Sequence, residues 1–186
     1  MLARLFDEAD GGLLRPRWAA AAAPGQTPYA VGAVEIVSNR TRTALRDAWV
    51  AEEAGTVVGT VLAYRMVAQK IGTDQPYARL KAHVVGSWYV DSLAIVEGRR
   101  GAGLGRLLLQ TAKEAARRAG CTTMSLLVYD TNAAAAALYA RCGFLEAGAG
   151  SLTPDQPSGA RSIRLLRCGI GEASEPAVER ARAQGI

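Results

Sequence analysis

Apolar and polar positions follow their clearest pattern in the middle of the chain. Residues 88–96 (WYVDSLAIV) form an apolar run with β-branched residues that stops before Gly98, and this predicts a buried strand. Residues 104–119 predict an amphipathic helix, and Gly120 is suited to end it. Residues 122–128 predict another strand, so the three elements would form a right-handed crossover with parallel strands. Spacings of three and four place these residues on the buried face of the helix: Leu104, Leu107, Leu108, Ala112, Ala115 and Ala116.

Weaker patterns flank this centre on both sides. Residues 66–86 have no sustained period and predict a long loop. From residue 171 the sequence is polar and alanine-rich, so we expect one mixed α/β domain over residues 1–170 and a tail over 171–186. The remaining expectations are helices over 2–9, 13–23, 27–36 and 133–142, strands over 48–54, 56–65, 144–147 and 162–167, and a loop over 148–159.

Length and composition narrow the class of protein. With 186 residues, 49% of them hydrophobic, the chain can form one domain with a full core. No run approaches twenty apolar residues, so we expect no membrane-spanning segment. The three cysteines form no C-x-x-C pair and fit reduced thiols with packing roles in a cytoplasmic protein. Because His83 is the one histidine and no Cys/His cluster occurs, we expect no metal site.

The net charge of +5 raises the question of nucleic-acid binding. Arginines are spread along the chain, and no aromatic residues interleave with them as a single-strand-binding face would require. A local concentration that includes Arg99, Arg100 and Arg106 is suited to a phosphate-bearing small molecule instead. We therefore expect no nucleic-acid partner.

The segment between the central strand and the helix contains a glycine-rich turn, residues 98–106 (GRRGAGLGR). Glycines allow positive φ, and the N–H groups and dipole of a helix N-terminus attract phosphate. Two common phosphate loops do not fit: the sixth position of a G-x-G-x-x-G motif is Arg106, and Leu104 stands where a Walker A loop has lysine. The pattern that fits is Arg100-x-x-Gly103-x-Gly105, and it predicts a pyrophosphate-binding turn.

A second motif lies in residues 128–144, which contain N-x-x-A followed by L-Y-x-x-x-G-F. The two motifs in this order resemble the GNAT superfamily of acetyl-CoA-dependent N-acetyltransferases, and the resemblance covers about residues 48–144. It implies the GNAT fold, which has a central, mixed, mostly antiparallel sheet flanked by helices. Within it, a parallel β-α-β core binds coenzyme A.

The resemblance also implies acetyl-CoA as the acetyl donor and assigns roles to residues. Backbone N–H groups of the central strand would bind the thioester carbonyl and pantetheine amides, and Tyr139 would protonate the departing thiolate. Asn132 and Tyr139 are seven residues apart, about two helical turns, so both would face the same side. The implied cofactor-binding residues are Leu93, Ala94, Ile95, Arg100, Gly101, Ala102, Gly103, Leu104, Gly105, Arg106, Asn132 and Tyr139.

The sequence specifies less closely which group takes the proton from the amine. An alkylamine with a pKa near 10 is neutral at only ~10⁻³ at pH 7, so a base or a water chain is needed. Some family members place a glutamate on the strand before the asparagine, where this sequence has Leu127. Strand alternation places Asp91, Leu93 and Ile95 on one face, which makes Asp91 the first candidate. Water and Glu97, which follows the strand, stay open as alternatives.

The leading hypothesis is an N-acetyltransferase that moves the acetyl group directly to a primary amine in a ternary complex, because no cysteine occupies a motif position. The alternative is a non-catalytic acyl-CoA-binding module that keeps the pyrophosphate turn. The acceptor, a small molecule or a peptide amine, is not specified, and a homodimer is a family-level expectation. By resemblance, the N-terminal helices and the 66–86 loop shape the acceptor side, so the candidate residues there are Trp18, Tyr29, Tyr77 and Arg79. For Trp18 we favour core packing over this role, and for the loop a solvated excursion is an equal alternative.

Most family members begin with a strand before the first helix, whereas this sequence begins inside the first predicted helix at Met1. Loss of an edge strand would expose the N–H and C=O groups of its neighbour. Either the first strand is absent or it lies upstream of Met1, and for this reason we favour the second.

Overall fold

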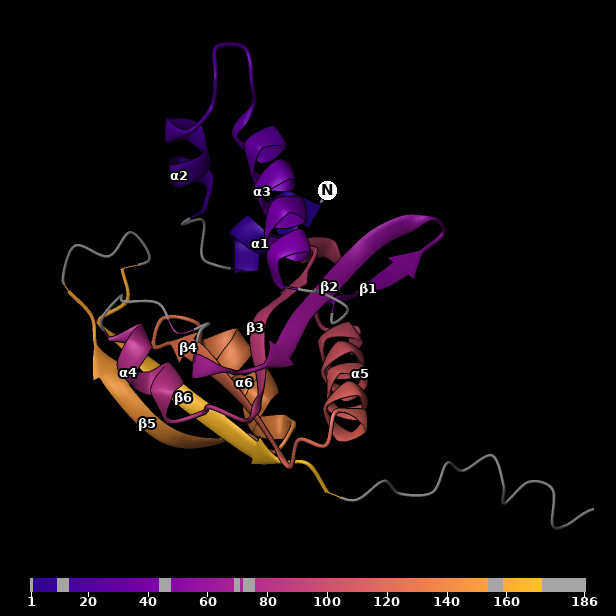
Figure 1. The fold of residues 1–186 in the computed structure, drawn as a ribbon. Helices are drawn as coiled ribbons and strands as arrows, with labels where there is room; N and C mark the ends of the chain where they lie inside the picture. Colours follow the sequence, from indigo (N-terminus) through magenta and orange to yellow (C-terminus); the bar gives the residue numbers. More distant parts are fainter. Residues whose placement is uncertain are drawn as a thin grey trace, which may run out of the picture.

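The computed structural model describes residues 2–9, 14–43, 48–68, 71, 76–153 and 159–171. Within this part of the chain, six strands form one sheet in the order β1-β2-β3-β4-β6-β5 (Figure 1). The strands are β1 (Ala48–Glu53), β2 (Thr56–Arg65), β3 (Trp88–Ile95), β4 (Thr123–Tyr129), β5 (Leu145–Ser151) and β6 (Ser162–Gly169). The helices are α1 (Leu2–Ala9), α2 (Leu14–Ala20), α3 (Pro28–Thr43), α4 (Tyr77–Ala82), the 3₁₀ turn η2 (Glu97–Arg99), α5 (Leu104–Arg118) and α6 (Ala133–Arg141).

The pairing of β3 with β4 is parallel, and all other neighbours in the sheet are antiparallel. The helix α5 connects β3 to β4, as a parallel pair requires, because its two strands need a long crossover between them. The predicted mixed, mostly antiparallel sheet with a parallel β-α-β core is therefore confirmed.

The parallel pair separates partway along its length. β3 and β4 pair over three residues and part after Val90 and Leu126. β3 remains paired with β2 as far as Ile95, and β4 remains paired with β6 as far as Tyr129. Within the described residues, the sheet therefore opens between its two central strands, and no strand pairs with the inner edges of their C-terminal halves.

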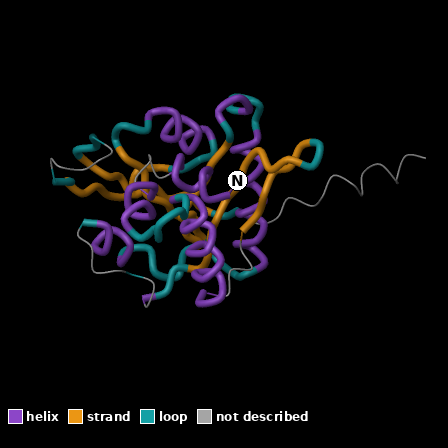
Figure 2. Tube along the Cα trace, turned by 90° about the horizontal axis from the view of Figure 1, so that it is seen from above, coloured by secondary structure: helices purple, strands orange, loops and turns teal. Residues whose placement is uncertain are grey.

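Helices lie on both sides of the sheet (Figure 2). On one face, α5 and α6 pack on a core that includes Val61, Val90 and Leu126. Side chains that point the opposite way form a second core with α4, which includes Leu80 and Tyr89. The helix α1 contacts β3 and β2, and α4 contacts β5 (Figure 1).

The buried face of α5 differs from the predicted one at two leucines. Leu107 is 55% exposed, whereas Leu109 is 3% exposed. Successive helical residues are separated by about 100°. In a view along the helix axis, Leu109, Ala112 and Ala116 lie on one side of Leu108 and face the core. Leu107 lies on the other side of Leu108. The three-and-four spacing identified the helix correctly, but it did not fix the direction of its buried stripe.

Three boundaries also differ from expectation. α3 extends to Thr43, beyond the predicted end near residue 36. The predicted loop 66–86 contains α4, a helix of six residues with one buried side chain, Leu80, which is too little to produce a visible period. β5 continues to Ser151 through the small residues expected to form a loop, because these pair with β6. The predicted tail beyond residue 171 lies outside the described residues.

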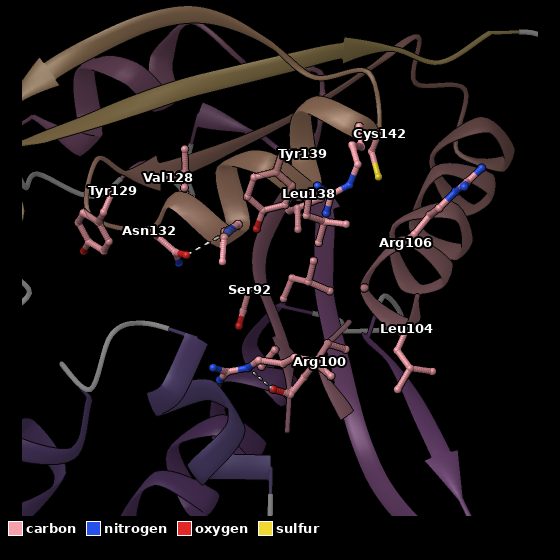
Figure 3. A pocket seen from close by; sticks show the side chains of 18 of the residues that line it. Ser92, Arg100, Leu104, Arg106, Val128, Tyr129, Asn132, Leu138, Tyr139 and Cys142 are labelled. Carbon is pink, nitrogen blue, oxygen red and sulfur yellow. Dashed lines mark hydrogen bonds between the residues drawn. The ribbon is translucent and has the colours of Figure 1, made fainter. Parts of the chain in front are cut away.

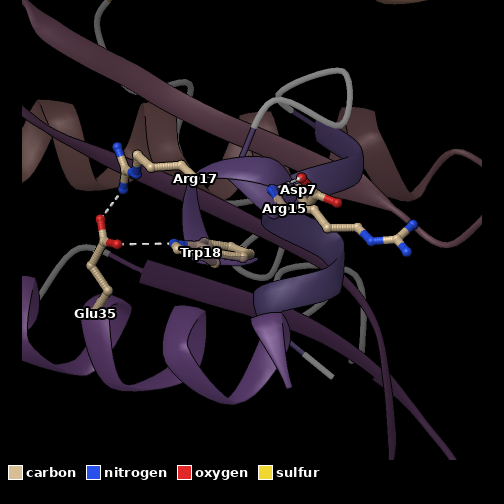
Figure 4. Close-up of polar contacts among 5 residues, drawn as sticks. All are labelled: Asp7, Arg15, Arg17, Trp18 and Glu35. Atoms are coloured by element: carbon tan, nitrogen blue, oxygen red, sulfur yellow. Dashed lines mark hydrogen bonds and ion pairs between the residues drawn. The ribbon is translucent and has the colours of Figure 1, made fainter. Parts of the chain in front are cut away.

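A set of polar contacts joins the three N-terminal helices (Figure 4). Trp18 of α2 is buried, and its indole N–H donates to Glu35 of α3 over 2.9 Å, while Arg17 pairs with the same carboxylate. Buried Asp7 of α1 accepts from the backbone N–H of Arg15 at 2.7 Å. These contacts fix α2 against α1 and α3.

None of the helices in the described ranges is long and apolar enough to cross a bilayer.

Candidate functional site

A cleft of about 860 Å³ lies where β3 and β4 separate. Its walls come from β3, the turn before α5, the first turn of α5, the end of β4 and α6 (Figure 3). Phe6 of α1 and Leu14 of α2 close one end. The cleft therefore forms because neighbouring strands diverge while their outer partners hold them in place.

The predicted pyrophosphate turn lines this cleft. Gly101 and Gly103 have φ of +82° and +83°, a region that costs other residues about 1–2 kcal/mol. Gly103 precedes α5, and no described side chain caps this helix end. The first bond within the helix runs from the Leu107 N–H to the Gly103 C=O (3.1 Å), so earlier N–H groups have no helical acceptor. An anion in the cleft would supply the missing acceptors.

Gly105 allows the first turn of α5 to approach α6 closely. A Cβ atom at this position would lie 2.9 Å from Leu138 Cδ2 of α6, which is closer than real Cβ atoms come. The glycine therefore narrows the cleft at this point, where both helices line it. Of the predicted cofactor-binding residues 100–106, all but Ala102 line the cleft.

Arginines give the cleft its positive charge. Arg100 donates from Nε to the Ile95 carbonyl over 3.2 Å, and Arg99 forms an ion pair with Glu53 of β1 at 2.7 Å. Arg106 and Arg141 also line the cleft. Positive charge and an uncapped helix end both favour a phosphate group.

Residues 93–95 of β3 line the cleft next to this turn. Their strand is paired with β2 on one edge, whereas its other edge lies where β4 has moved away. The side chains of Leu93 and Ile95 pack against the α5 core, and Ala94 is buried. The main chain of this segment is therefore the part able to form polar contacts in the cleft.

The two predicted residues of α6 also reach the cleft (Figure 3). Asn132 caps the helix, because its side-chain oxygen accepts from the Ala135 N–H over 3.1 Å. Tyr139 is 7% exposed, and its ring packs against Phe144 with centroids 5.8 Å apart. Burial, with a smaller effect from Cys142, raises the pKa of Tyr139 to about 12. Its hydroxyl is therefore protonated at neutral pH and can donate a proton.

Asp91 lines the cleft as well, but at an irregular point of β3. Leu62 of β2 pairs with Ser92, whereas the next residue, Ala63, pairs with Val90. Asp91 is therefore an extra residue without a partner on β2, which is a β-bulge. A bulge changes which face the following side chains occupy.

The predicted alternation of Asp91, Leu93 and Ile95 on one face is consequently wrong. Leu93 and Ile95 pack on the α5 side, whereas Asp91 contacts residues near the opposite core. The Tyr64 hydroxyl donates to Asp91 Oδ1 over 3.3 Å, and Lys81 Nζ lies 3.9 Å from the same oxygen. Burial first, and the charge of Asp91 second, raise the pKa of Tyr64, so this hydroxyl remains a donor.

Comparison with known proteins identifies the family. The sequence profile of the Acetyltransferase (GNAT) family matches residues 18–144. The chain belongs to this family. It is a GNAT N-acetyltransferase that uses acetyl-CoA, and GNAT enzymes acetylate amine acceptors. A search of curated protein sequences finds no match.

Solved structures with the same fold include several acetyltransferases. One described simply as an acetyltransferase is 21% identical, with a TM-score of 0.60, and the match covers 91% of this chain and 93% of that one. The ribosomal-protein-S18-alanine N-acetyltransferase from Escherichia coli is 20% identical, with a TM-score of 0.56 and coverage of 76% and 79%. The structure of yncA from Salmonella typhimurium with its cofactor acetyl-CoA is 21% identical, with a TM-score of 0.55 and coverage of 78% and 77%. At these identities the likeness establishes the fold alone.

Sequence reasoning missed several residues of the GNAT cleft and included some that lie elsewhere. Phe6, Leu14 and Tyr129 line the cleft, whereas the substrate-wall candidates Trp18 and Tyr29 do not. Of the other candidates for the acceptor side, Tyr77 contacts Tyr129, whereas Arg79 lines a separate hollow between α4 and β5. Glu97, the alternative proton acceptor, lies in the exposed turn η2 and does not line the cleft. No periodic signal distinguishes a cleft-lining apolar residue from a core residue, because both occupy the inner face of a helix.

The cysteines and the possible metal ligands also have defined places. Cys121 and Cys168 are buried, in agreement with packing roles, whereas Cys142 is partly buried and lines the cleft. Among the described residues, no group of three His, Cys, Asp or Glu side chains is arranged to hold a metal ion.

Burial of Tyr139 predicts a loss of stability at high pH. The pKa of Tyr139 is about 12 in the folded protein and about 10 when unfolded, so above pH 10 the unfolded state loses this proton first. The free energy of unfolding should therefore fall by about 2–3 kcal/mol, from this residue, as the pH rises from 10 to 12. Urea denaturation of the wild type and of Tyr139→Phe from pH 8 upward measures the difference. An equally steep fall in the variant would contradict this account.

Proposed function

We propose that this GNAT enzyme transfers the acetyl group directly from acetyl-CoA to a primary amine while both substrates are bound. The main observation in support is the single cleft that joins an uncapped helix N-terminus, the Tyr139 hydroxyl and the Asp91 carboxylate. These three features suit the pyrophosphate, the departing thiolate and the proton of the amine, respectively. Direct transfer requires no protein nucleophile between donor and acceptor.

The coenzyme-binding part of the proposal rests on the turn and on β3. The N–H groups of the first turn of α5 would hold the pyrophosphate, with Arg100 and Arg106 adding positive charge. The main chain of residues 93–95 would bind the pantetheine amides and the thioester carbonyl, and Asn132 would contact the coenzyme from α6. The positive φ of Gly101 and Gly103 supports this assignment, because a cradle of main-chain N–H groups needs such a conformation.

Two side chains would move protons. When the amine nitrogen attacks the thioester carbon, the carbon–sulfur bond breaks and the sulfur leaves with its electron pair. Tyr139, which is protonated at neutral pH, would donate its proton to that sulfur. Asp91 would accept the proton that the amine nitrogen loses, directly or through one water. Main-chain N–H groups of β3 would stabilise the negative charge on the carbonyl oxygen.

The first test is binding of the donor. In a thermal-shift titration, acetyl-CoA at a hundred times its Kd should stabilise the protein by about 2.7 kcal/mol. For a chain of this size this corresponds to a rise in Tm of about 5–10 °C. NAD and ATP are the controls, since both carry phosphates but lack pantetheine. Equal shifts with all three, or no shift with acetyl-CoA, would contradict the site.

The second test is transfer. Free coenzyme A should accumulate from acetyl-CoA when a panel of primary amines is supplied, and each acetylated product should be detected by mass spectrometry.

We propose that residues 1–170 act as one domain in this reaction, without a nucleic-acid or membrane partner. Whether two copies associate is a separate question that sedimentation analysis answers.

A further inference from the structure

A cluster of aromatic and charged side chains lies on the face of the sheet away from α5 and meets the cleft at Asp91. Tyr64 and Tyr89 pack together with ring centroids 5.9 Å apart. The Lys81 ammonium lies 5.1 Å from the centre of the Tyr89 ring, and Asp91 lies beside it. These residues come from β2, β3 and α4, so the cluster exists only in the folded protein.

One face of α4 supplies a partner to two cleft-lining residues. The hydroxyls of Tyr77 and Tyr129 are 3.0 Å apart, and Lys81 forms the ion pair with Asp91 at 3.9 Å. Tyr77 and Lys81 are four residues apart and therefore lie on the same side of the helix. α4 thus contacts two residues of the cleft, Tyr129 and Asp91, although no helix is predicted here from the pattern of residues.

The negative charge of Asp91 is balanced by the positive charge of Lys81 beside it. Among the described residues that line the cleft, Asp91 is the one carboxylate, and the other charged residues are arginines. Its partner Lys81 is only 21% exposed, so solvent screens this ammonium less than it would a surface lysine. A cationic amine that approaches Asp91 therefore meets a positive charge beside the negative one. Like charges in close proximity disfavour the protonated form of the amine.

A nearby positive charge disfavours the protonated form of an amine, and amines differ greatly in how much of that form they contain at neutral pH. An α-amino group has a pKa of about 7.7–8.0, whereas a lysine side-chain amine has a pKa of about 10.4. At pH 7 the neutral fraction of the α-amine is roughly 300 times larger. A site that opposes an ammonium ion therefore selects amines that are already partly neutral.

We propose that the acceptor is an α-amino group, as at the N-terminus of a peptide, and that Lys81 is a specificity-determining residue that excludes more basic amines. This inference rests on the proposed function, in which Asp91 faces the acceptor amine. The apolar side chains of Phe6 and Leu14, together with Tyr129, line the same cleft as Asp91. They suit an uncharged residue next to the reacting amine.

The test compares kcat/KM for two acceptors with one amine each: alanyl-phenylalanine amide, with a free α-amine, and Nα-acetyl-lysine amide, with a free side-chain amine. Both are assayed with the wild type, Lys81→Gln and Lys81→Arg. The wild type should prefer the α-amine, and Lys81→Gln should reduce this preference about tenfold by admitting the lysine amine. Lys81→Arg keeps the charge and should retain the preference, which separates the effect of charge from that of lost packing on Tyr89.

The outcomes distinguish the two proposals. A wild-type enzyme that acetylates the lysine amine as well as the α-amine, or a preference unchanged in Lys81→Gln, would overturn the assignment of Lys81 and leave acetyl transfer intact. Acetyl-CoA binding without acetylation of either amine would overturn this inference, whereas the proposed transfer would fall only if the whole panel of primary amines also gave no product. Melting temperatures of the three proteins establish that each is folded.

Discussion

The variant Gly103→Glu is expected to lose acetyl-CoA binding, with affinity reduced at least about a hundredfold. Gly103 has φ of +83° and directly precedes α5, so a glutamate there would place its carboxylate before the uncapped helix N-terminus. A carboxylate is favoured at that position by the helix dipole, typically by 0.3–1 kcal/mol, and it would repel a phosphate from the same place. The variant should therefore fold and yet fail to bind, which calorimetric titration with acetyl-CoA would measure.

Two matched variants separate the causes. Gly103→Asn introduces a side chain that tolerates positive φ but has no charge, and it should keep affinity within about tenfold of the wild type. Gly98→Glu places the same carboxylate in the neighbouring η2 turn, where an added Cβ meets open space and the position does not line the cleft. It should bind nearly normally. Near-normal affinity in Gly103→Glu would remove the pyrophosphate assignment of the turn.

The second large effect is expected for Tyr139→Phe, which should lower kcat about a hundredfold, within the usual range for loss of a general acid. The phenyl ring preserves the contact with Phe144 and fills the same volume, so the fold and the Kd of acetyl-CoA should change little. Because burial raises the pKa of Tyr139 to about 12, the wild-type hydroxyl is protonated throughout the neutral range. Initial rates and donor binding, measured from pH 6 to 10, provide the comparison.

Tyr29→Phe is the matched control, because it removes a tyrosine hydroxyl outside the cleft. This residue lies in the N-terminal helices, where its hydroxyl donates to Asp7 over 3.3 Å, and it does not line the cleft. Its kcat should remain within a fewfold of the wild-type value. If Tyr139→Phe turned over as fast as the wild type at every pH, Tyr139 would have no role as an acid.

The features that could be predicted from the sequence are those encoded by neighbouring residues. The strand, the glycine turn and α5 follow one another directly, so spacing and φ requirements identify them without knowledge of the rest of the chain. The cap at Asn132 and the burial of Tyr139 follow in the same way from positions on one helix. This is why the fold and the family could be predicted and then confirmed.

The surroundings of Asp91 depend on residues distant in sequence. Its bulge arises from the register of β3 against β2, and its partners Tyr64 and Lys81 come from other elements. Neither the register nor these contacts have a period or a motif, so alternation placed Asp91 on the wrong face. Likewise, α4 is too short to show an apolar stripe and is stabilised mainly by packing against β5 and the second core.

In the proposed function, donor binding is therefore a local property, because consecutive main-chain N–H groups, whose conformation a few glycines dictate, would hold the phosphate. The opening between β3 and β4, and the pairing of Lys81 with Asp91 at the acceptor end, exist only after strands and helices from across the chain have packed. The cost of burying or pairing a charge depends on which groups surround it in space. For this reason the sequence indicated the acetyl donor, whereas the preference for an α-amine acceptor could be inferred only from the folded structure.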